Sequence, residues 1–278
     1  MPRVTVGVSL KAYFGRRQAR IWFTQVAARA RSHDAVRSGA VEVFVIPTYL
    51  QLEDARGCFE GTRIALGAQD VSAYPAGAYT GEITAAELAE SGVTLAEIGH
   101  AERRRLFGET DADTAAKATA ALSAGITPVL CLGETERMDA AAAAAATVAQ
   151  LHADLDGAPA GRVVVAYEPV WAIGAPEPAP ASHIVAVARA LRAALDADAA
   201  RAGSTVIYGG SAGPGLLTRL GDDVDGLFLG RFAHDPDAFA AVLDEAAALA
   251  SRRGAQPPVV ERGAQRRDET PRPTSTRS

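Results

Sequence analysis

The sequence predicts an α/β fold in which eight parallel strands close into a single (β/α)8 barrel. Short apolar runs rich in β-branched residues recur eight times along the chain, and helical patterns separate most of them. The runs are continuously hydrophobic rather than alternating, which is typical of parallel strands buried on both faces. Eight such units fit a chain of 278 residues as one large domain.

The elements are expected in a regular order. The eight strands are expected at Val4–Ser9, Val41–Ile46, Ile64–Ala68, Leu95–Ile98, Thr127–Leu132, Val163–Tyr167, Thr205–Tyr208 and Gly226–Leu229. A helix is expected from about Gln18, and the run Ala140–Ala146 favours another because alanine is the best helix former. An open doubly wound sheet is the alternative, but it would want a glycine-rich fingerprint that residues 4–15 do not contain.

The repeating pattern ends after Ser251. Residues 252–278 are rich in Pro, Arg, Thr and Ser and contain few apolar residues, so they cannot bury enough surface to fold. We therefore expect a barrel domain at residues 1–251 and a disordered tail at residues 252–278. A basic docking tail is the alternative for this segment.

Composition and charge exclude several classes of protein. The formal net charge of -5 gives no basic footprint, so nucleic acid is not expected as a partner. We find neither an apolar stretch that could span a membrane nor a signal peptide, and we expect a cytoplasmic protein. Cys58 and Cys131 can form neither a disulfide framework nor a cysteine-rich zinc site. We expect no metal ion and no cofactor.

Polar residues follow several predicted strands, at the end of the barrel where the active sites of such folds lie. They are Ser9 and Lys11 at the first strand, His100 after the fourth, Glu168 after the sixth, Gly209–Ser211 after the seventh and Gly230–Arg231 after the eighth. A carboxylate base, two donors and two glycine-rich turns fit proton abstraction next to a carbonyl in a phosphorylated substrate. Glu168 can be the base, and His100 and Lys11 can donate to the oxygen that becomes an enediolate.

Each of these residues also has an ordinary structural explanation. A lone histidine after a strand is more often structural, and a lysine at a strand end is usually solvated. Lys11, however, is one of only two lysines in the chain. We interpret Cys131 as a core residue and Glu134 as an acid that holds a neighbouring turn. No role is assigned to the remaining histidines, which are His33, His152, His183 and His234.

Several motifs resemble those of the triosephosphate isomerase family, over about Val4–Leu249. They are Gly77–Glu82 (GAYTGE), Ile98–Arg104 (IGHAERR), Cys131–Glu134 (CLGE), Tyr167–Gly174 (YEPVWAIG) and Tyr208–Ser211 (YGGS). The second resembles the family's histidine motif, the fourth its catalytic glutamate with the start of a closing loop, and the last its phosphate turn.

The resemblance implies a TIM barrel and a set of roles that are carried over from the family. Glu168 would be the base and His100 a neutral electrophile. Lys11 would stabilise the enediolate and the phosphate, and Glu102 would support the electrophilic pair of His100 and Lys11. The implied substrate-binding residues are Ser9, Gly174, Gly210, Ser211, Gly230 and Arg231. The protruding segment around Thr80 would enter a partner subunit, so a homodimer is expected.

The departures from the family pattern concern the substrate. Where the family has asparagine this chain has Ser9, and where the family has two glycines it has Gly230–Arg231. Ala101 replaces the usual serine, and Ala175–Glu177 replaces the usual threonine-glycine-lysine. Serine before the lysine, with a Gly-Arg turn, is similar to the branch that interconverts L-erythrulose 1-phosphate and D-erythrulose 4-phosphate. The shorter Ser9 side chain could make room for the additional hydroxymethyl group.

We therefore expect a sugar-phosphate isomerase, an intramolecular oxidoreductase acting on a small phosphorylated ketose. The four-carbon substrate is slightly favoured over dihydroxyacetone phosphate and glyceraldehyde 3-phosphate. A Schiff-base aldolase using Lys11 is an alternative, since barrels host that chemistry too. A non-catalytic binding descendant is another, and the joint presence of Lys11, His100 and Glu168 argues against it.

Overall fold

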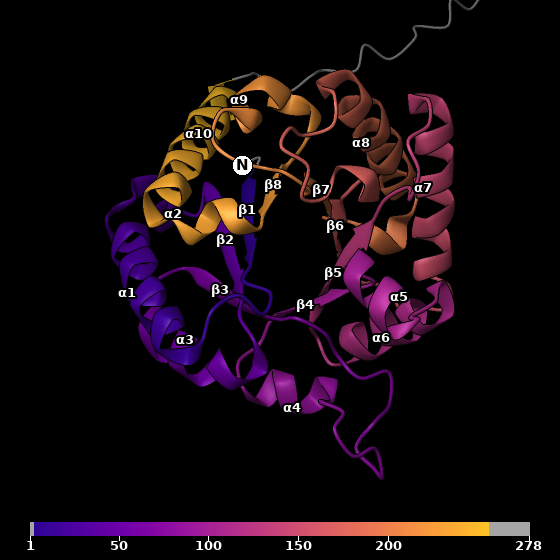
Figure 1. Cartoon of the computed structure of the whole chain (residues 1–278), viewed down its shortest axis with the longest axis horizontal. Helices are drawn as coiled ribbons and strands as arrows, with labels where there is room; N and C mark the ends of the chain where they lie inside the picture. Colours follow the sequence, from indigo (N-terminus) through magenta and orange to yellow (C-terminus); the bar gives the residue numbers. More distant parts are fainter. Residues whose placement is uncertain (1–2, 256–278) are drawn as a thin grey trace, which may run out of the picture.

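A closed ring of parallel strands forms the centre of the protein, and helices surround it (Figure 1). The structure is a computed structural model that describes residues 3–255 of the 278. The strands of this part are β1 (Val4–Ser9), β2 (Val41–Ile46), β3 (Ile64–Ala68), β4 (Leu95–Ile98), β5 (Thr127–Leu132), β6 (Val164–Tyr167), β7 (Thr205–Tyr208) and β8 (Gly226–Leu229). Each strand pairs with its neighbours in sequence, and β8 pairs with β1, so the ring closes. The predicted (β/α)8 barrel is confirmed.

Helices cover the outside of the ring (Figure 1). In residues 3–255 they are α1 (Arg16–Ser32), α2 (Asp34–Ser38), α3 (Leu52–Phe59), α4 (Ala85–Glu90), α5 (Ala101–Phe107), α6 (Asp111–Ser123), α7 (Ala140–Asp154), α8 (Ala181–Asp196), α9 (Leu216–Leu220) and α10 (Pro236–Ala255). The alanine run lies in α7, as its helix propensity predicts. Helix α1 begins two residues before the expected start at Gln18.

Helix α10 continues past Ser251, where the pattern of apolar residues ends. Arg253 explains the extension, because its Nε donates to Asp222 at 2.9 Å and its terminal nitrogen donates to the Val224 carbonyl at 2.7 Å. The expectation that disorder begins at Arg252 is therefore wrong for residues 252–255, which are helical. The rest of that expected tail, residues 256–278, lies outside the described residues.

The strands separate two apolar cores. Residues that face outwards pack against the helices, and those that face inwards fill the ring, among them Phe44, Leu95, Val129 and Phe228. Successive residues of a strand point to opposite faces, so Glu97 points to the same side as Leu95. A carboxyl group therefore enters the apolar interior of the ring.

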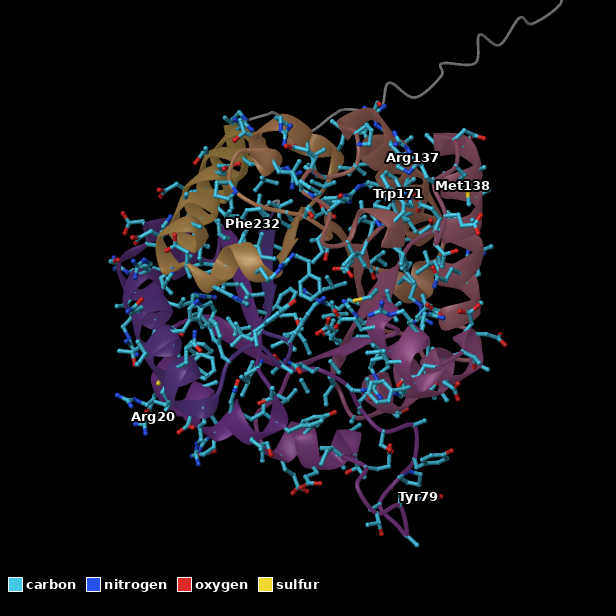
Figure 2. All side chains as sticks on the ribbon, viewed as in Figure 1. Arg20, Tyr79, Arg137, Met138, Trp171 and Phe232 are labelled. Carbon is cyan, nitrogen blue, oxygen red and sulfur yellow. The ribbon has the colours of Figure 1, made fainter. Side chains whose placement is uncertain are left out.

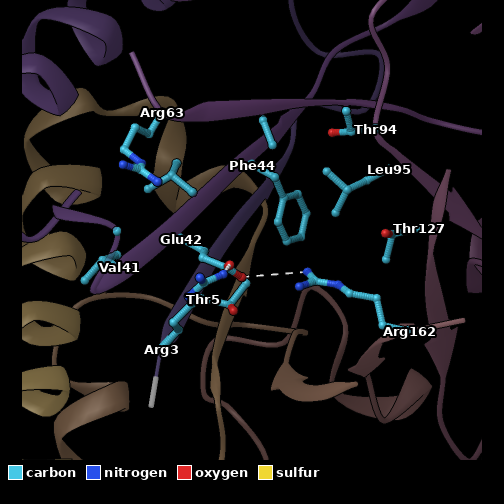
Figure 3. A pocket seen from close by; sticks show the side chains of 13 residues that line it. Arg3, Thr5, Val41, Glu42, Phe44, Arg63, Thr94, Leu95, Thr127 and Arg162 are labelled. Carbon is cyan, nitrogen blue, oxygen red and sulfur yellow. Dashed lines mark hydrogen bonds and ion pairs between the residues drawn. The ribbon is translucent and has the colours of Figure 1, made fainter. Parts of the chain in front are cut away.

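A cavity of about 410 Å³ lies at the end of the ring where the strands begin (Figure 3). Glu42 pairs there with Arg3 and, at 3.7 Å, with Arg162. Phe44 forms part of the lining from inside the ring. This end carries none of the polar residues that the sequence singles out, and the corresponding end of (β/α)8 barrels serves stability.

An ion pair joins α5 to α7 behind the strand ends. The Arg104 guanidinium donates two hydrogen bonds to Asp154, at 2.9 and 2.8 Å, and its Nε donates to the Gly99 carbonyl at 2.8 Å. Asp154 is fully buried. Arg104 thus fixes the turn before α5 from two sides.

Replacing Asp154 by alanine is expected to destabilise the protein by about 3 kcal/mol, because it removes two charge-assisted hydrogen bonds from a largely buried guanidinium, which then keeps only Asp111 as an acidic partner. Urea unfolding of Asp154→Ala measures the change. The matched control is Asp156→Ala, which removes an exposed carboxyl two residues further on. Equal stability of the two variants would contradict a structural role for the Arg104–Asp154 pair.

Candidate active site

The residues expected to be catalytic meet at the ends of β1, β4 and β6. His100 Nε2 lies 3.4 Å from Glu168 Oε2, and Lys11 Nζ lies 2.9 Å from Glu102 Oε1. His100 and Glu168 are buried, at 4% and 8% exposure. The structure therefore brings together a carboxylate, an imidazole and an ammonium group from segments that are far apart in the sequence.

The position of His100 determines which of its nitrogens can act on a substrate. His100 is the N-cap of α5, and its Nδ1 accepts a hydrogen bond from the Glu102 backbone N–H at 3.0 Å. A nitrogen that accepts carries no proton, so the ring is neutral with its proton on Nε2. Nε2 is buried and has no hydrogen-bond partner among the described residues. It is a free donor aimed at the site.

A glycine turn sets the direction of His100. Gly99 has φ +69°, and a Cβ at this position would lie 2.9 Å from Thr114 Cγ2. Both the left-handed backbone and the close approach require glycine. This turn redirects the chain from β4 into α5 and leaves the imidazole at the mouth of the barrel.

Lys11 is held in an unusual backbone conformation with φ +47°. Gln69 Nε2 donates to the Lys11 carbonyl at 2.8 Å and supports it. Burial lowers the pKa of Lys11, but the charges of Glu168 and Glu102 outweigh burial and raise the pKa above its ordinary value. The amine is therefore kept as an ammonium group. The same ion pair lowers the pKa of Glu102, against the effect of its burial.

Glu168 follows β6 and lies against the turn after β7. A Cβ on Gly209 would come within 2.3 Å of Glu168 Oε1 and 2.5 Å of its Cγ. Only glycine therefore fits beside the carboxyl group in this position. The Glu168 backbone N–H donates to the Leu132 carbonyl at 2.7 Å, which ties the base to the end of β5.

The segment after Glu168 is closed over the site by contacts to its backbone. Ser211 Oγ donates to the Ala175 carbonyl at 2.6 Å, and the Ala179 N–H donates to the Tyr208 hydroxyl at 3.2 Å. These bonds do not involve the side chains of Ala175–Glu177. The unusual sequence at the end of this segment is therefore compatible with closure.

Glu134 anchors the start of the closing segment. Its carboxylate accepts hydrogen bonds from the Tyr167 hydroxyl, from Trp171 Nε1 at 2.9 Å and from His183 Nε2 at 2.8 Å. Trp171 also lies under the Arg137 guanidinium, 5.2 Å from the ring centre (Figure 2). The structural interpretation of Glu134 agrees with these contacts, but His183, which received no role, is one of its partners.

The residues expected to bind phosphate line one cavity of about 600 Å³. Among its lining residues are Lys11, Glu102, Gly174, Gly210, Ser211, Gly230 and Arg231. The Arg231 guanidinium lies beside Gly174, so it faces the cavity rather than solvent alone. Phe232 lies at the same mouth (Figure 2). An anion in this cavity would meet one ammonium group, one guanidinium and two glycine-rich turns.

A second cavity of about 530 Å³ lies on the other side of Ile173 and Glu102, which line both. It reaches Glu168 and is also lined by Cys131 and Thr135. Burial raises the pKa of the Cys131 thiol well above its usual value. Cys131 is therefore an uncharged core residue, in agreement with its interpretation from sequence.

Ser9 does not border an empty space. Its hydroxyl donates to Glu97 Oε2 at 2.7 Å, and both residues are buried. The room expected beside the short Ser9 side chain is thus occupied by the Glu97 carboxyl group. Sequence reasoning missed Glu97, although a single acid within the apolar run Leu95–Ile98 was a signal.

Two structural findings concern ligands and membranes. Between residues 3 and 255 we find no group of three or more His, Cys, Asp or Glu side chains that could hold a metal ion. No helix in the same part of the chain is long and apolar enough to cross a bilayer.

Comparison with known proteins gives the same family over nearly the whole barrel. The model of the triosephosphate isomerase family matches residues 4–246. The chain is 47% identical to L-erythrulose-1-phosphate isomerase of Pectobacterium atrosepticum, over 90% of this chain and 98% of that protein. It is 41% identical to triosephosphate isomerase of Symbiobacterium thermophilum, over 76% of this chain and 86% of that protein.

A solved structure agrees with these sequence relatives. The crystal structure of triosephosphate isomerase from Bartonella henselae superimposes with a TM-score of 0.75 and 28% identity, covering 87% of this chain and 98% of that one. The family match extends over the strands that carry Lys11, His100 and Glu168. This chain is therefore an isomerase of the triosephosphate isomerase family.

Proposed function

We propose that this isomerase interconverts L-erythrulose 1-phosphate and D-erythrulose 4-phosphate through an enediolate, with Glu168 as the base. The observation that carries the reaction type is the facing pair of Glu168 Oε2 and the proton-bearing His100 Nε2, 3.4 Å apart in a buried site. A base beside a neutral donor is what proton transfer between two neighbouring carbons requires.

The proposed mechanism starts with the phosphate in the cavity between Lys11 and Arg231. Glu168 takes the proton from the hydroxyl-bearing carbon next to the carbonyl, and the electrons of that C–H bond form the enediolate. His100 Nε2–H donates to the developing oxyanion, and the Lys11 ammonium group stabilises its charge. The proton then returns from Glu168 to the former carbonyl carbon, and the hydroxyl proton moves between the two oxygens. No net atom is gained or lost.

The closed segment keeps water away from this intermediate. The hydrogen bond from Ser211 to Ala175 and that from the Ala179 N–H to Tyr208 hold this segment over the site. An enediolate that carries a phosphate on the next carbon eliminates it when water has access, so closure protects the product.

Two observations favour the four-carbon substrate. The relative named L-erythrulose-1-phosphate isomerase is 47% identical over 90% of the chain, whereas the Symbiobacterium triosephosphate isomerase is 41% identical over 76%. Ser9 and Gly230–Arg231 are also similar to the erythrulose-phosphate branch. Triosephosphate isomerase activity is the second candidate, because it uses the same catalytic residues.

The Schiff-base alternative is disfavoured by the state of Lys11. An amine must lose its proton before it attacks a carbonyl. The carboxylates around Lys11 raise the pKa of its amine instead, and the ion pair with Glu102 occupies it. We further propose a cytoplasmic location, in keeping with the free thiols of Cys58 and Cys131.

Assays of the purified protein with erythrulose phosphates and with dihydroxyacetone phosphate will identify the preferred substrate. We expect a higher kcat/KM for the four-carbon substrate, because a triose phosphate leaves part of the site unfilled, and a misplacement of about 1 Å can cost on the order of 10²-fold in rate. Rapid turnover of triose phosphates with none of erythrulose phosphates would mean that the second candidate is correct.

Glu168→Gln is expected to lower kcat roughly 10²- to 10⁴-fold, because the amide cannot accept the carbon-bound proton. Binding of inorganic phosphate, measured by calorimetry, should change little, since the phosphate cavity is intact. Glu136→Gln, the same change at an exposed carboxyl, is the control. Near-normal turnover by Glu168→Gln would rule out this base.

We also propose that the protein is a homodimer joined by the segment between β3 and α4. This segment projects from the barrel (Figure 1), and Tyr79 lies on its projecting part (Figure 2). Tyr74 and Tyr79 stack with ring centres 4.4 Å apart, yet they are 51% and 41% exposed. Large exposed aromatic side chains on a projecting segment are typical of an interface.

Sedimentation at micromolar concentration is expected to show a dimer that Thr80→Asp weakens, because a charge would be buried in the partner subunit. Arg252→Asp places the same charge on the exposed end of α10 and is the control. A wild-type protein that sediments as a monomer would contradict the proposal.

A further inference from the structure

Glu97 is a buried carboxyl group for which the proposed mechanism has no use. It projects from β4 into the ring and is 3% exposed. Its Oε2 accepts the hydrogen bond from Ser9, whereas no group among the described residues donates to Oε1. A carboxyl oxygen in such a place is costly unless a partner satisfies it.

The free oxygen of Glu97 faces the reacting groups. Glu97 Oε1 lies 3.9 Å from His100 Nε2, too far for a hydrogen bond, and His100 Nε2 lies 3.4 Å from Glu168 Oε2. His100 Nε2 is itself buried without a partner. Two unpartnered polar atoms therefore border one place, directly beside the base.

A substrate oxygen in contact with Glu97 should be a hydroxyl rather than the enediolate oxygen. Burial raises the pKa of Glu97, the charge of Glu168 adds to this, and the hydrogen bond from Ser9 and the charge of Lys11 oppose it. A hydroxyl both donates and accepts, so it can bond to the acid or to the carboxylate. An enediolate oxygen could bond only to the acid and would be repelled by the carboxylate.

We propose that Glu97, anchored by Ser9, binds the hydroxyl of the additional hydroxymethyl group of a four-carbon substrate and so determines substrate choice. The inference rests on the proposed function and names the residue that selects its substrate. In a tetrulose phosphate this hydroxyl stands on the carbon next to the reacting pair, on the side away from the phosphate. His100 Nε2 would hold the oxygens of the reacting carbons, and Glu97 Oε1 would hold the next oxygen along the chain.

The proposal also explains why serine suits position 9. The Ser9 hydroxyl donates to Glu97 Oε2 at 2.7 Å, which fixes the carboxyl group and leaves Oε1 as its only free oxygen. A triose phosphate has no hydroxyl to reach Oε1. Its binding would leave Oε1 without a partner and cut off from water, and a site of that kind discriminates against the shorter substrate.

The test is the ratio of kcat/KM for L-erythrulose 1-phosphate to kcat/KM for dihydroxyacetone phosphate. Glu97→Met keeps the length of the side chain and removes its hydrogen bonds, with Glu97→Leu as a replacement if the methionine variant does not fold. We expect the ratio to fall by about 10-fold or more, as for loss of a buried hydrogen bond. Glu97→Gln, which still donates and accepts, is expected to keep the ratio within about threefold of wild type.

Thr135→Val is the matched control, because it removes a hydroxyl from the second cavity, on the other side of Ile173. Its ratio should equal that of wild type. Equal losses of kcat/KM on both substrates in Glu97→Met would mean that Glu97 only positions His100. A ratio in Glu97→Gln as low as in Glu97→Met would mean that Glu97 transfers a proton instead of binding a hydroxyl. Either result overturns the inference. A wild type inactive on erythrulose phosphates would instead overturn the proposed function.

Discussion

Closure of the ring of parallel strands places the carboxyl ends of all eight described strands on one face of the barrel. Eight parallel strands in the described residues pair in sequence order, and β8 returns to β1. Residues as far apart as Ser9 and Arg231 therefore reach one site without any long loop. The same closure fills the ring with side chains, so a polar group that points inwards can meet solvent or substrate only at the two ends.

The site depends on how the charged and polar side chains at the strand ends are paired. Lys11 is neutralised by Glu102, and His100 is kept neutral by the backbone N–H that its Nδ1 accepts. Beside the base, His100 Nε2 and Oε1 of Glu97 make no hydrogen bond to the described residues. Folding leaves these atoms unsatisfied, and a substrate that satisfies them recovers that free energy on binding.

Most of the barrel could be predicted from sequence because strands buried on both faces give continuous apolar runs. Seven of the eight expected strands have the bounds found in the structure, and β6 begins one residue late. The end of α10 could not be predicted, because it depends on contacts of Arg253 with Asp222 and Val224 rather than on apolar residues. The residues expected to be catalytic could be singled out because Lys11, His100 and Glu168 each stand within two residues of a strand end.

Contacts between distant elements were harder to predict. Glu97 sits inside an apolar run, and its partner Ser9 lies 88 residues away, so neither position reveals the pair. His183 shows no pattern on α8 that points to Glu134, which lies 49 residues away. The end of the closing segment departs from the family sequence, but the hydrogen bonds that hold it run through the backbone of Ala175 and Ala179. Side-chain identity there has little influence on them.

The location of the contact between Ser9 and Glu97 is relevant to substrate choice. Proton transfer between neighbouring carbons needs the same base and donors for three carbons as for four, so in the proposed mechanism Glu168, His100 and Lys11 would not distinguish the substrates. The phosphate is also common to both, and Arg231 beside Gly174 lines the cavity proposed for it. Discrimination must therefore arise where the substrates differ, beyond the reacting carbons. There the ring offers a polar group from β4, held by the last residue of β1, in an interior that is otherwise apolar.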